Sequence, residues 1–80
     1  MMRLKKSIAI SENGFVFNAA RGDSFSTNPI GLFILEMIKA GKDTKVVQQE
    51  VTNKYAIDDS TAERDIHDFV KMLKQYDLLD

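Results

Sequence analysis

The 80-residue sequence contains no cysteine, no tryptophan, one proline and one histidine. Because cysteine is absent, disulfides, thiolate metal ligands and cysteine nucleophiles are excluded. The chain has a single histidine, His67. This excludes two-histidine metal sites and argues against most general-base schemes that depend on histidine. Glu63 and Lys71 lie four residues away on either side, so we interpret His67 as a solvated helical residue. The composition favours binding over catalysis, and we expect no enzyme activity, no metal site and no cofactor.

The sequence also lacks a long apolar run and an excess of one charge. Ile8–Ile10, which follows the basic N-terminus, is shorter than the apolar run of about 7–15 residues in a secretory signal or about 20 in a membrane span. We therefore expect a cytoplasmic protein without a membrane partner. Eleven basic and twelve acidic residues give a formal net charge of -1, which argues against affinity based on phosphate neutralisation. We expect one domain over residues 1–80, with a flexible basic N-terminus over residues 1–6.

The first third of the sequence predicts three short strands. Ser7–Ser11 and Phe15–Ala19 are rich in β-branched and aromatic residues. Asn13-Gly14 between them is typical of a tight hairpin turn. Arg21-Gly22-Asp23 predicts the next turn, and residues 24–26 predict a very short third strand. This pattern indicates an antiparallel meander in which the second strand is central and the third lies at an edge.

The remainder of the sequence predicts three helices. Asn28 is typical of an N-cap, with Pro29 at the first helical position and Gly41 at the end of the helix. Thr44 is the expected cap of the second helix. The third helix has the clearest start, because Ser60-Thr61-Ala62-Glu63 fits a capping box.

Apolar residues recur at helical spacing and are expected to form the core. They are Ile30, Phe33, Ile34, Met37, Ile38, Val46, Val47, Val51, Ala62, Ile66, Phe69, Val70 and Leu73. The third helix should end near Gln75, after which Leu78-Leu79 would fold back onto the core. The predicted fold class is α+β and winged-helix-like, with a three-stranded antiparallel β-meander followed by three α-helices.

Winged helices often bind DNA, so DNA binding is one alternative function, and a general protein-interaction domain is another. The charge of the last third argues against DNA, because a helix-turn-helix would place its groove-reading residues on the last helix. The acidic residues there are Asp58, Asp59, Glu63, Asp65, Asp68, Asp77 and Asp80, and the basic ones are Arg64, Lys71 and Lys74. Such a helix repels phosphates at physiological salt.

The order and spacing of apolar and turn residues lead to a family resemblance. The pattern runs Asn28-x-x-Gly31-x-x-Ile34-Leu35-x-x-Ile38-x-x-Gly41 and Thr44, then Val47, Val51 and Tyr55, then Asp65-Ile66-x-x-Phe69-Val70-x-x-Leu73 and Leu78-Leu79. Over about residues 7–80 this sequence resembles the PqqD family, that is, pyrroloquinoline quinone synthesis protein D and its relatives. Members often have glycine where this chain has Ala56 and Asp77. Aspartate tolerates the left-handed conformation, so we expect Asp77 to end the helix and the loop at Ala56 to follow a different path.

The resemblance implies a non-catalytic adaptor that binds the leader segment of a ribosomally made precursor peptide. In the family the leader adds as a strand beside the third strand and the last helix, and is presented to a modifying enzyme, often a radical S-adenosylmethionine protein. The residues independently predict a short polar edge strand with unpaired backbone groups, which strand addition requires. The alternative is a solvated edge that is kept short to avoid aggregation.

Eight residues are the predicted peptide-binding residues. They are Asp23, Ser24, Phe25 and Ser26 on the edge strand and Asp65, Phe69, Met72 and Tyr76 on the last helix. Met72 is the preferred groove residue, because it lies off the core stripe and methionine adapts to varied apolar partners. Tyr76 would line the same groove with its ring while its hydroxyl stays hydrated. Alternation along the strand would direct Phe25 into the core.

We expect negligible affinity for duplex DNA at physiological salt, because the acidic last third repels the phosphate backbone. Fluorescence anisotropy with a labelled random duplex at about 150 mM salt measures this affinity. Submicromolar binding would contradict the charge argument.

Overall fold

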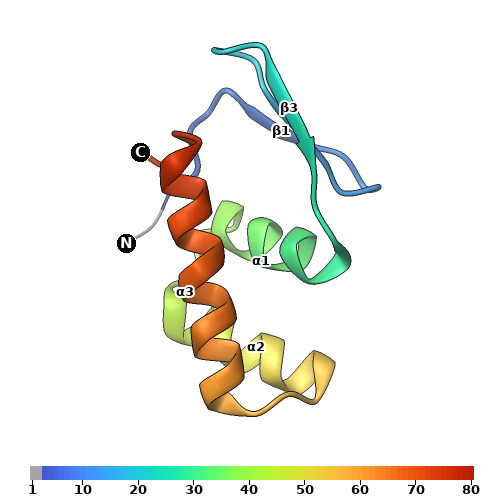
Figure 1. Ribbon diagram of the computed structural model, residues 1–80, viewed down its shortest axis with the longest axis vertical. Coiled ribbons are helices and arrows are strands. Elements are labelled where there is room, and N and C mark those ends of the chain that lie inside the picture. Colours follow the sequence, from blue (N-terminus) through green and yellow to red (C-terminus); the bar gives the residue numbers. More distant parts are fainter. Residues whose placement is uncertain (1–2) are drawn as a thin grey trace.

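The computed structural model describes residues 3–80. It contains β1 (Ile8–Ile10), β2 (Phe15–Asn18), β3 (Asp23–Ser26), α1 (Pro29–Lys39), α2 (Thr44–Tyr55) and α3 (Asp59–Gln75) (Figure 1). The strands form one antiparallel sheet in the order β1-β2-β3, so β2 is central and β3 is an edge strand. The predicted α+β fold of a β-meander followed by three helices is confirmed, and α3 ends at the predicted residue.

The two faces of the sheet differ because side chains alternate along each strand. Val16 of β2 lies opposite Ile10 of β1 and Phe25 of β3. Val16 is fully buried in one cluster with residues of all three helices. Phe15 and Phe17 occupy the other face and are exposed. The sheet therefore buries one face against the helices.

The β1–β2 turn is one residue longer than a two-residue hairpin turn. The Ser11 N–H donates to the Phe15 carbonyl at 2.8 Å, which closes a loop of residues 12–14. Gly14 alone in this loop has a positive φ, of 83°, as in three-residue hairpin loops. A Cβ at Gly14 would lie 2.6 Å from the Thr27 carbonyl oxygen. The glycine therefore serves both the turn and the close approach of the segment after β3.

Two predicted helix caps are correct, and two are wrong by one or two residues. At α1 the Asn28 side chain accepts from the Gly31 N–H at 2.8 Å, and Gly41 adopts a left-handed φ of 87° after the helix. At α2 the cap is Asp43 instead of Thr44, because the Asp43 carboxylate accepts from a backbone N–H in the first turn. Aspartate caps at least as well as threonine, and Thr44 becomes the first helical residue.

The N-cap of α3 is Asp58 instead of Ser60. The Asp58 carboxylate accepts from the Thr61 N–H at 3.3 Å, and the Ser60 hydroxyl donates to the same carboxylate at 3.0 Å. Hydrogen bonds from Thr61 and Ser60 hold the pKa of Asp58 below its ordinary value. The earlier start places half-buried Ile57 just before the cap and buried Ala62 at the fourth helical position, the spacing of a hydrophobic staple.

Two non-glycine residues after helices adopt the left-handed conformation. Asp77 has a φ of 59° and ends α3 as expected. Ala56, for which we expected a different loop path, has a φ of 54° and a ψ of 38°. Its N–H donates to the Thr52 carbonyl at 3.0 Å. Alanine here adopts the conformation that glycine takes most easily.

The core lies between the inner face of the sheet and the three helices. Its buried members are Leu4, Ile8, Val16, Ile34, Leu35, Met37, Ile38, Val47, Val51, Ala62, Ile66, Leu73 and Leu78. Leu78 folds back onto the core as predicted. Val46 is exposed instead of extending the buried face of α2. No helix in the described chain has the length and apolar character needed to cross a membrane.

The N-terminal segment is part of this core, which corrects the expected flexible terminus for residues 3–6. Leu4 is buried and forms an isolated antiparallel bridge with Leu79. The Lys5 N–H donates to the Leu78 carbonyl, and the Asp80 N–H donates to the Arg3 carbonyl. The first and last described segments therefore lie side by side (Figure 1). Residues 1–2 of the predicted flexible segment lie outside the described residues.

We expect Ala56→Gly to raise the free energy of unfolding by about 0.5–1 kcal/mol, because glycine removes the left-handed penalty of alanine at some entropic cost. Urea denaturation measures the change. Ala40→Gly is the matched control, since Ala40 caps α1 with a right-handed φ of -77° and should gain nothing. Equal destabilisation by both substitutions would contradict this explanation.

Candidate functional site

The outer edge of β3 offers unpaired backbone groups. The Thr27 N–H donates to the Gly14 carbonyl at 2.8 Å, which sets the phase of the ladder between β2 and β3. Because pairing alternates along antiparallel strands, the backbone groups of Phe25 face β2. Those of Ser24 and Ser26 face away from it, and no backbone hydrogen bond outside the ladder uses either N–H within residues 3–80. The edge therefore exposes two donors and two acceptors.

The opposite edge of the sheet is less open. The Ser11 N–H donates to β2, so the backbone groups of Ile8 and Ile10 point outward from β1 by the same alternation. The Ile8 N–H already donates to the Lys5 carbonyl at 3.1 Å. One of the two outward donors of this three-residue strand is therefore engaged. The β3 edge is the better template for an added strand.

A groove of about 420 Å³ lies between the start of α1 and the middle of α3. It is lined by Asn28, Ile30, Gly31, Ile34, Asp65, Asp68, Phe69 and Met72. Asn28 comes two residues after β3, so the groove begins where the edge strand ends. Most of the lining is apolar, and two carboxylates and one amide supply its polar groups. Such a lining suits an apolar side chain with a polar or basic neighbour.

Gly31 sets how closely α1 and α3 approach at this groove. A Cβ at Gly31 would lie 3.0 Å from Cε1 of Phe69 and would also collide with the Thr27 hydroxyl. Without a side chain at this position, the ring of Phe69 packs directly against the first turn of α1. A larger residue would push Phe69 into the groove, so glycine keeps the groove open.

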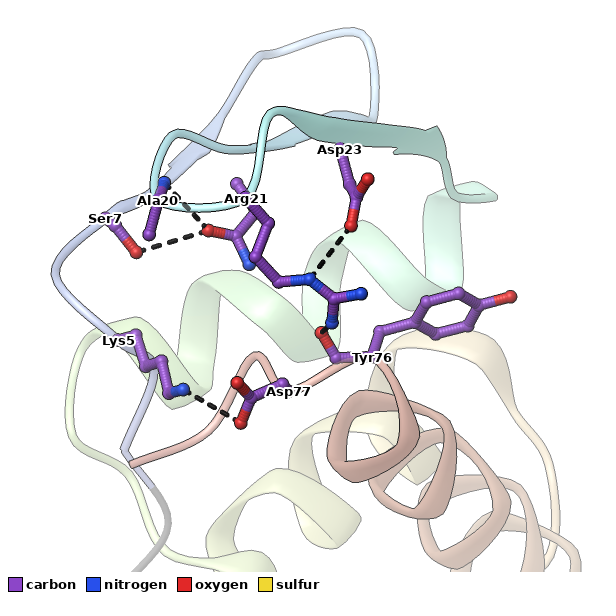
Figure 2. Close-up of polar contacts among 8 residues, drawn as sticks. Lys5, Ser7, Ala20, Arg21, Asp23, Tyr76 and Asp77 are labelled. Atoms are coloured by element: carbon purple, nitrogen blue, oxygen red, sulfur yellow. Dashed lines mark hydrogen bonds and ion pairs between the residues drawn. The ribbon is translucent and has the colours of Figure 1, made fainter.

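Arg21 joins β3 to the end of α3. Its Nη1 donates to the Tyr76 carbonyl at 3.1 Å, and its Nε pairs with Asp23 Oδ2 at 3.1 Å. Figure 2 shows the guanidinium between these two acceptors, with the Tyr76 ring extending away from them. That ring stacks on Phe25, with centroids 5.8 Å apart and an interplanar angle of 24°. One polar and one aromatic contact thus hold β3 against α3.

A second ion pair holds the turn that follows α3. Lys5 Nζ lies 2.8 Å from Asp77 Oδ1 (Figure 2). This contact with Lys5, helped by the charge of Arg21, lowers the pKa of Asp77 below its ordinary value. Asp77 is exposed and Lys5 is half-buried, so the pair contributes little to the stability of the fold.

The structure brings seven of the eight predicted site residues to two neighbouring surfaces. Residues 23–26 form all of β3, and Asp65, Phe69 and Met72 line the groove. Tyr76 caps the end of α3 and stacks on Phe25 instead of lining the groove. The half-buried Phe25 turns toward the core side, as alternation predicted.

Sequence reasoning missed six residues of this region. They are Arg21, Asn28, Ile30, Gly31, Ile34 and Asp68. Three of them, Asn28, Gly31 and Ile34, belong to the family pattern and could have been assigned to the site from it. Arg21 could not, because its acceptor on Tyr76 lies 55 residues away in the chain.

A second cavity, of about 650 Å³, lies between α2 and α3. It is lined by Thr44, Lys45, Gln48, Glu63, Ile66, His67, Val70 and Lys74. Its charges are mixed, and none of its lining residues belongs to β3. His67 is exposed there, as predicted. No group of three or more histidine or acidic residues suited to a metal ion occurs among residues 3–80.

Comparison with known proteins identifies the family. The family model of coenzyme PQQ synthesis protein D (PqqD) matches residues 13–79. The fold is similar to that of TbiB1 in complex with the TbiA(beta) leader peptide, with 22% identity, a TM-score of 0.88, and coverage of 98% of this chain and 94% of that chain. It is also similar to lasso peptide synthetase B1 complexed with the leader peptide, with 24% identity, a TM-score of 0.86, and coverage of 99% and 96%.

No curated protein sequence gives a significant match to this chain. The family match nevertheless spans more than four fifths of the residues, and it includes β2, β3 and all three helices. Two of the three segments that carry the sequence pattern, those that begin at Asn28 and Asp65, contribute residues to the groove. The chain therefore belongs to the PqqD family.

Proposed function

We propose that this protein captures the leader segment of a ribosomally made precursor peptide by strand addition to β3 and presents it to a modifying enzyme. Family membership supports this function, and both similar structures contain a leader peptide. A radical S-adenosylmethionine enzyme is the modifying partner that the family suggests. A cytoplasmic location, where ribosomes make the precursor, is part of the proposal.

The observation that carries the proposal is the open edge of β3. Ser24 and Ser26 direct two N–H and two carbonyl groups away from β2. An extended peptide can satisfy all four by continuing the ladder. Four such hydrogen bonds contribute about 1 kcal/mol each, which does not exceed the cost of ordering a free peptide. Backbone pairing therefore determines where the peptide lies, but side chains must supply the affinity.

The groove beside β3 supplies that affinity. In an added strand, the side chains opposite Phe25 point toward the helices. From the end of β3 they reach the groove lined by Phe69 and Met72. Each apolar side chain buried there adds roughly 1.5–3 kcal/mol. One or two of them raise the affinity to a useful level, and the flexible thioether of Met72 adapts to their shape.

Preorganisation of β3 also favours binding. Arg21 holds the start of the strand against the Tyr76 carbonyl, and the stacked rings of Phe25 and Tyr76 hold its middle. The edge is therefore held in place before the peptide arrives, which lowers the cost of ordering on binding.

We expect Met72→Lys to weaken leader binding by tenfold or more, because a charged head group replaces an apolar wall of the groove. The unfolding free energy should change little, since Met72 is only half-buried. The test titrates the ¹⁵N-labelled protein with synthetic leader segments of precursor peptides encoded near its gene. Val46→Lys on exposed α2 is the matched control and should bind normally.

The same titration maps the site. Amide shifts should gather on residues 23–26 and 65–76. Perturbations confined to β1 or α2, with these two segments unmoved, would show that the peptide docks elsewhere.

We expect Ser24→Pro to weaken leader binding while β3 stays paired with β2, because the N–H it removes points away from β2. Ser24→Ala is the matched control, since it removes the hydroxyl and keeps the N–H. Peptide titration and urea denaturation of both variants separate binding from folding. If Ser24→Ala weakens binding as much as Ser24→Pro, backbone pairing at this position is not the cause.

A further inference from the structure

The face of the sheet turned away from the helices carries two unexplained phenylalanines. Phe15 and Phe17 of β2 are 48% and 41% exposed. They lie two residues apart on the same strand, so their Cα atoms are about 7 Å apart on one face. Neither belongs to the core or packs against it. The fold therefore does not account for these two rings.

Every direct neighbour of the two rings on this face is small. Phe15 lies opposite Ser26, and Phe17 lies opposite Ser24 on β3 and Ala9 on β1. By continuation of the β1–β2 register, Ser11 lies opposite Phe15 on the other side. We call these six residues, Ala9, Ser11, Phe15, Phe17, Ser24 and Ser26, the outer sheet face. It carries no charge, and its rings stand above a row of serines at the open edge.

We propose that Phe15 and Phe17 select leader peptides with large apolar side chains on the outer sheet face. This inference rests on the proposed function. Peptide residues that pair with Ser24 and Ser26 direct their side chains to this face, because opposite residues share a face. Two strand spacings, about 10 Å, separate such a residue from β2. A serine leaves the intervening space open, so a leucine, isoleucine or aromatic side chain reaches across it to a phenylalanine ring.

The outer sheet face is continuous with the open edge of β3, and for this reason we assign it to the peptide. The rings are paired directly with the two serines whose backbone groups receive the added strand. At the opposite edge of the sheet, one of the two outward N–H groups of β1 already donates to the Lys5 carbonyl. An added strand at β3 thus places side chains on both faces: one set toward Phe25 and the groove, the other toward Phe15 and Phe17.

The selectivity that follows is a sequence pattern in the ligand. The residues opposite Ser24 and Ser26 occupy positions i and i+2 of the peptide, and both should be large and apolar. The residue between them points toward the helices. The preferred substrate is therefore an extended segment with apolar side chains on both faces, instead of one that alternates between apolar and charged residues.

The test selects phage-displayed random 12-residue peptides on the wild-type protein and on Phe15→Thr/Phe17→Thr. Threonine keeps a β-branched residue in the strand, and urea denaturation checks that the variant is folded. Val46→Thr on α2 is the matched control for loss of an exposed apolar side chain. Wild-type selection should enrich large apolar residues at i and i+2, and the double variant should lose this enrichment. A selected peptide should bind the double variant about tenfold more weakly, about 1.4 kcal/mol, and Val46→Thr normally.

Amide shifts and sedimentation separate the ways in which the inference fails. If selected peptides shift Ser24 and Ser26 but bind the double variant with unchanged affinity, the inference is wrong and the proposed function stands. If they leave β3 unshifted, both are wrong. If the wild type sediments as a dimer and the double variant as a monomer of equal peptide affinity, a second copy covers this face. If the double variant binds peptide normally but no longer supports modification of the peptide by the partner enzyme, the enzyme covers this face. Coverage by a second copy or by the enzyme overturns the inference.

Discussion

The register between β2 and β3 determines both faces of the sheet and the position of its open edge. Val16 lies opposite Phe25 and faces the core, whereas a shift of one residue would turn Val16 to solvent and exchange the two faces. Both ends of the pairing are held. At one end the Thr27 N–H donates to Gly14, and at the other the buried Asn18 accepts backbone N–H groups from the following turn. These contacts also fix which β3 backbone groups point outward.

The proposed site divides peptide recognition between backbone and side chains. The outward groups of Ser24 and Ser26 can pair with any extended chain, because every peptide carries the same backbone donors and acceptors. Selectivity therefore requires surfaces on either side of the added strand. The groove at Met72 lies on the helix side, and Phe17 stands on the other. An 80-residue domain with one small core can build such a site because it needs no enclosed cavity.

Local sequence patterns predicted the elements well but placed some of their ends wrongly. Asn28 caps α1 as predicted, whereas Asp58 caps α3 two residues before the expected Ser60. Both residues can cap a helix, and burial of the flanking Ile57 distinguishes them, which a local motif does not contain. The N-terminal residues looked like a solvated basic arm, but Leu4 packs into the core through its bridge to Leu79.

The sequence by itself determined the order of strands and helices, the polar edge strand and the family, because each depends on local spacing that short-range sterics and capping enforce. Only the tertiary structure determined the shape of the groove and the contacts that join β3 to α3. Gly31 against Phe69 and Arg21 against Tyr76 are contacts between residues 38 and 55 positions apart. The same is true of the outer sheet face, since strand register decides which side of the sheet each side chain occupies. Such pairs leave no periodic trace in the sequence, because they exist only after the core has brought distant segments together.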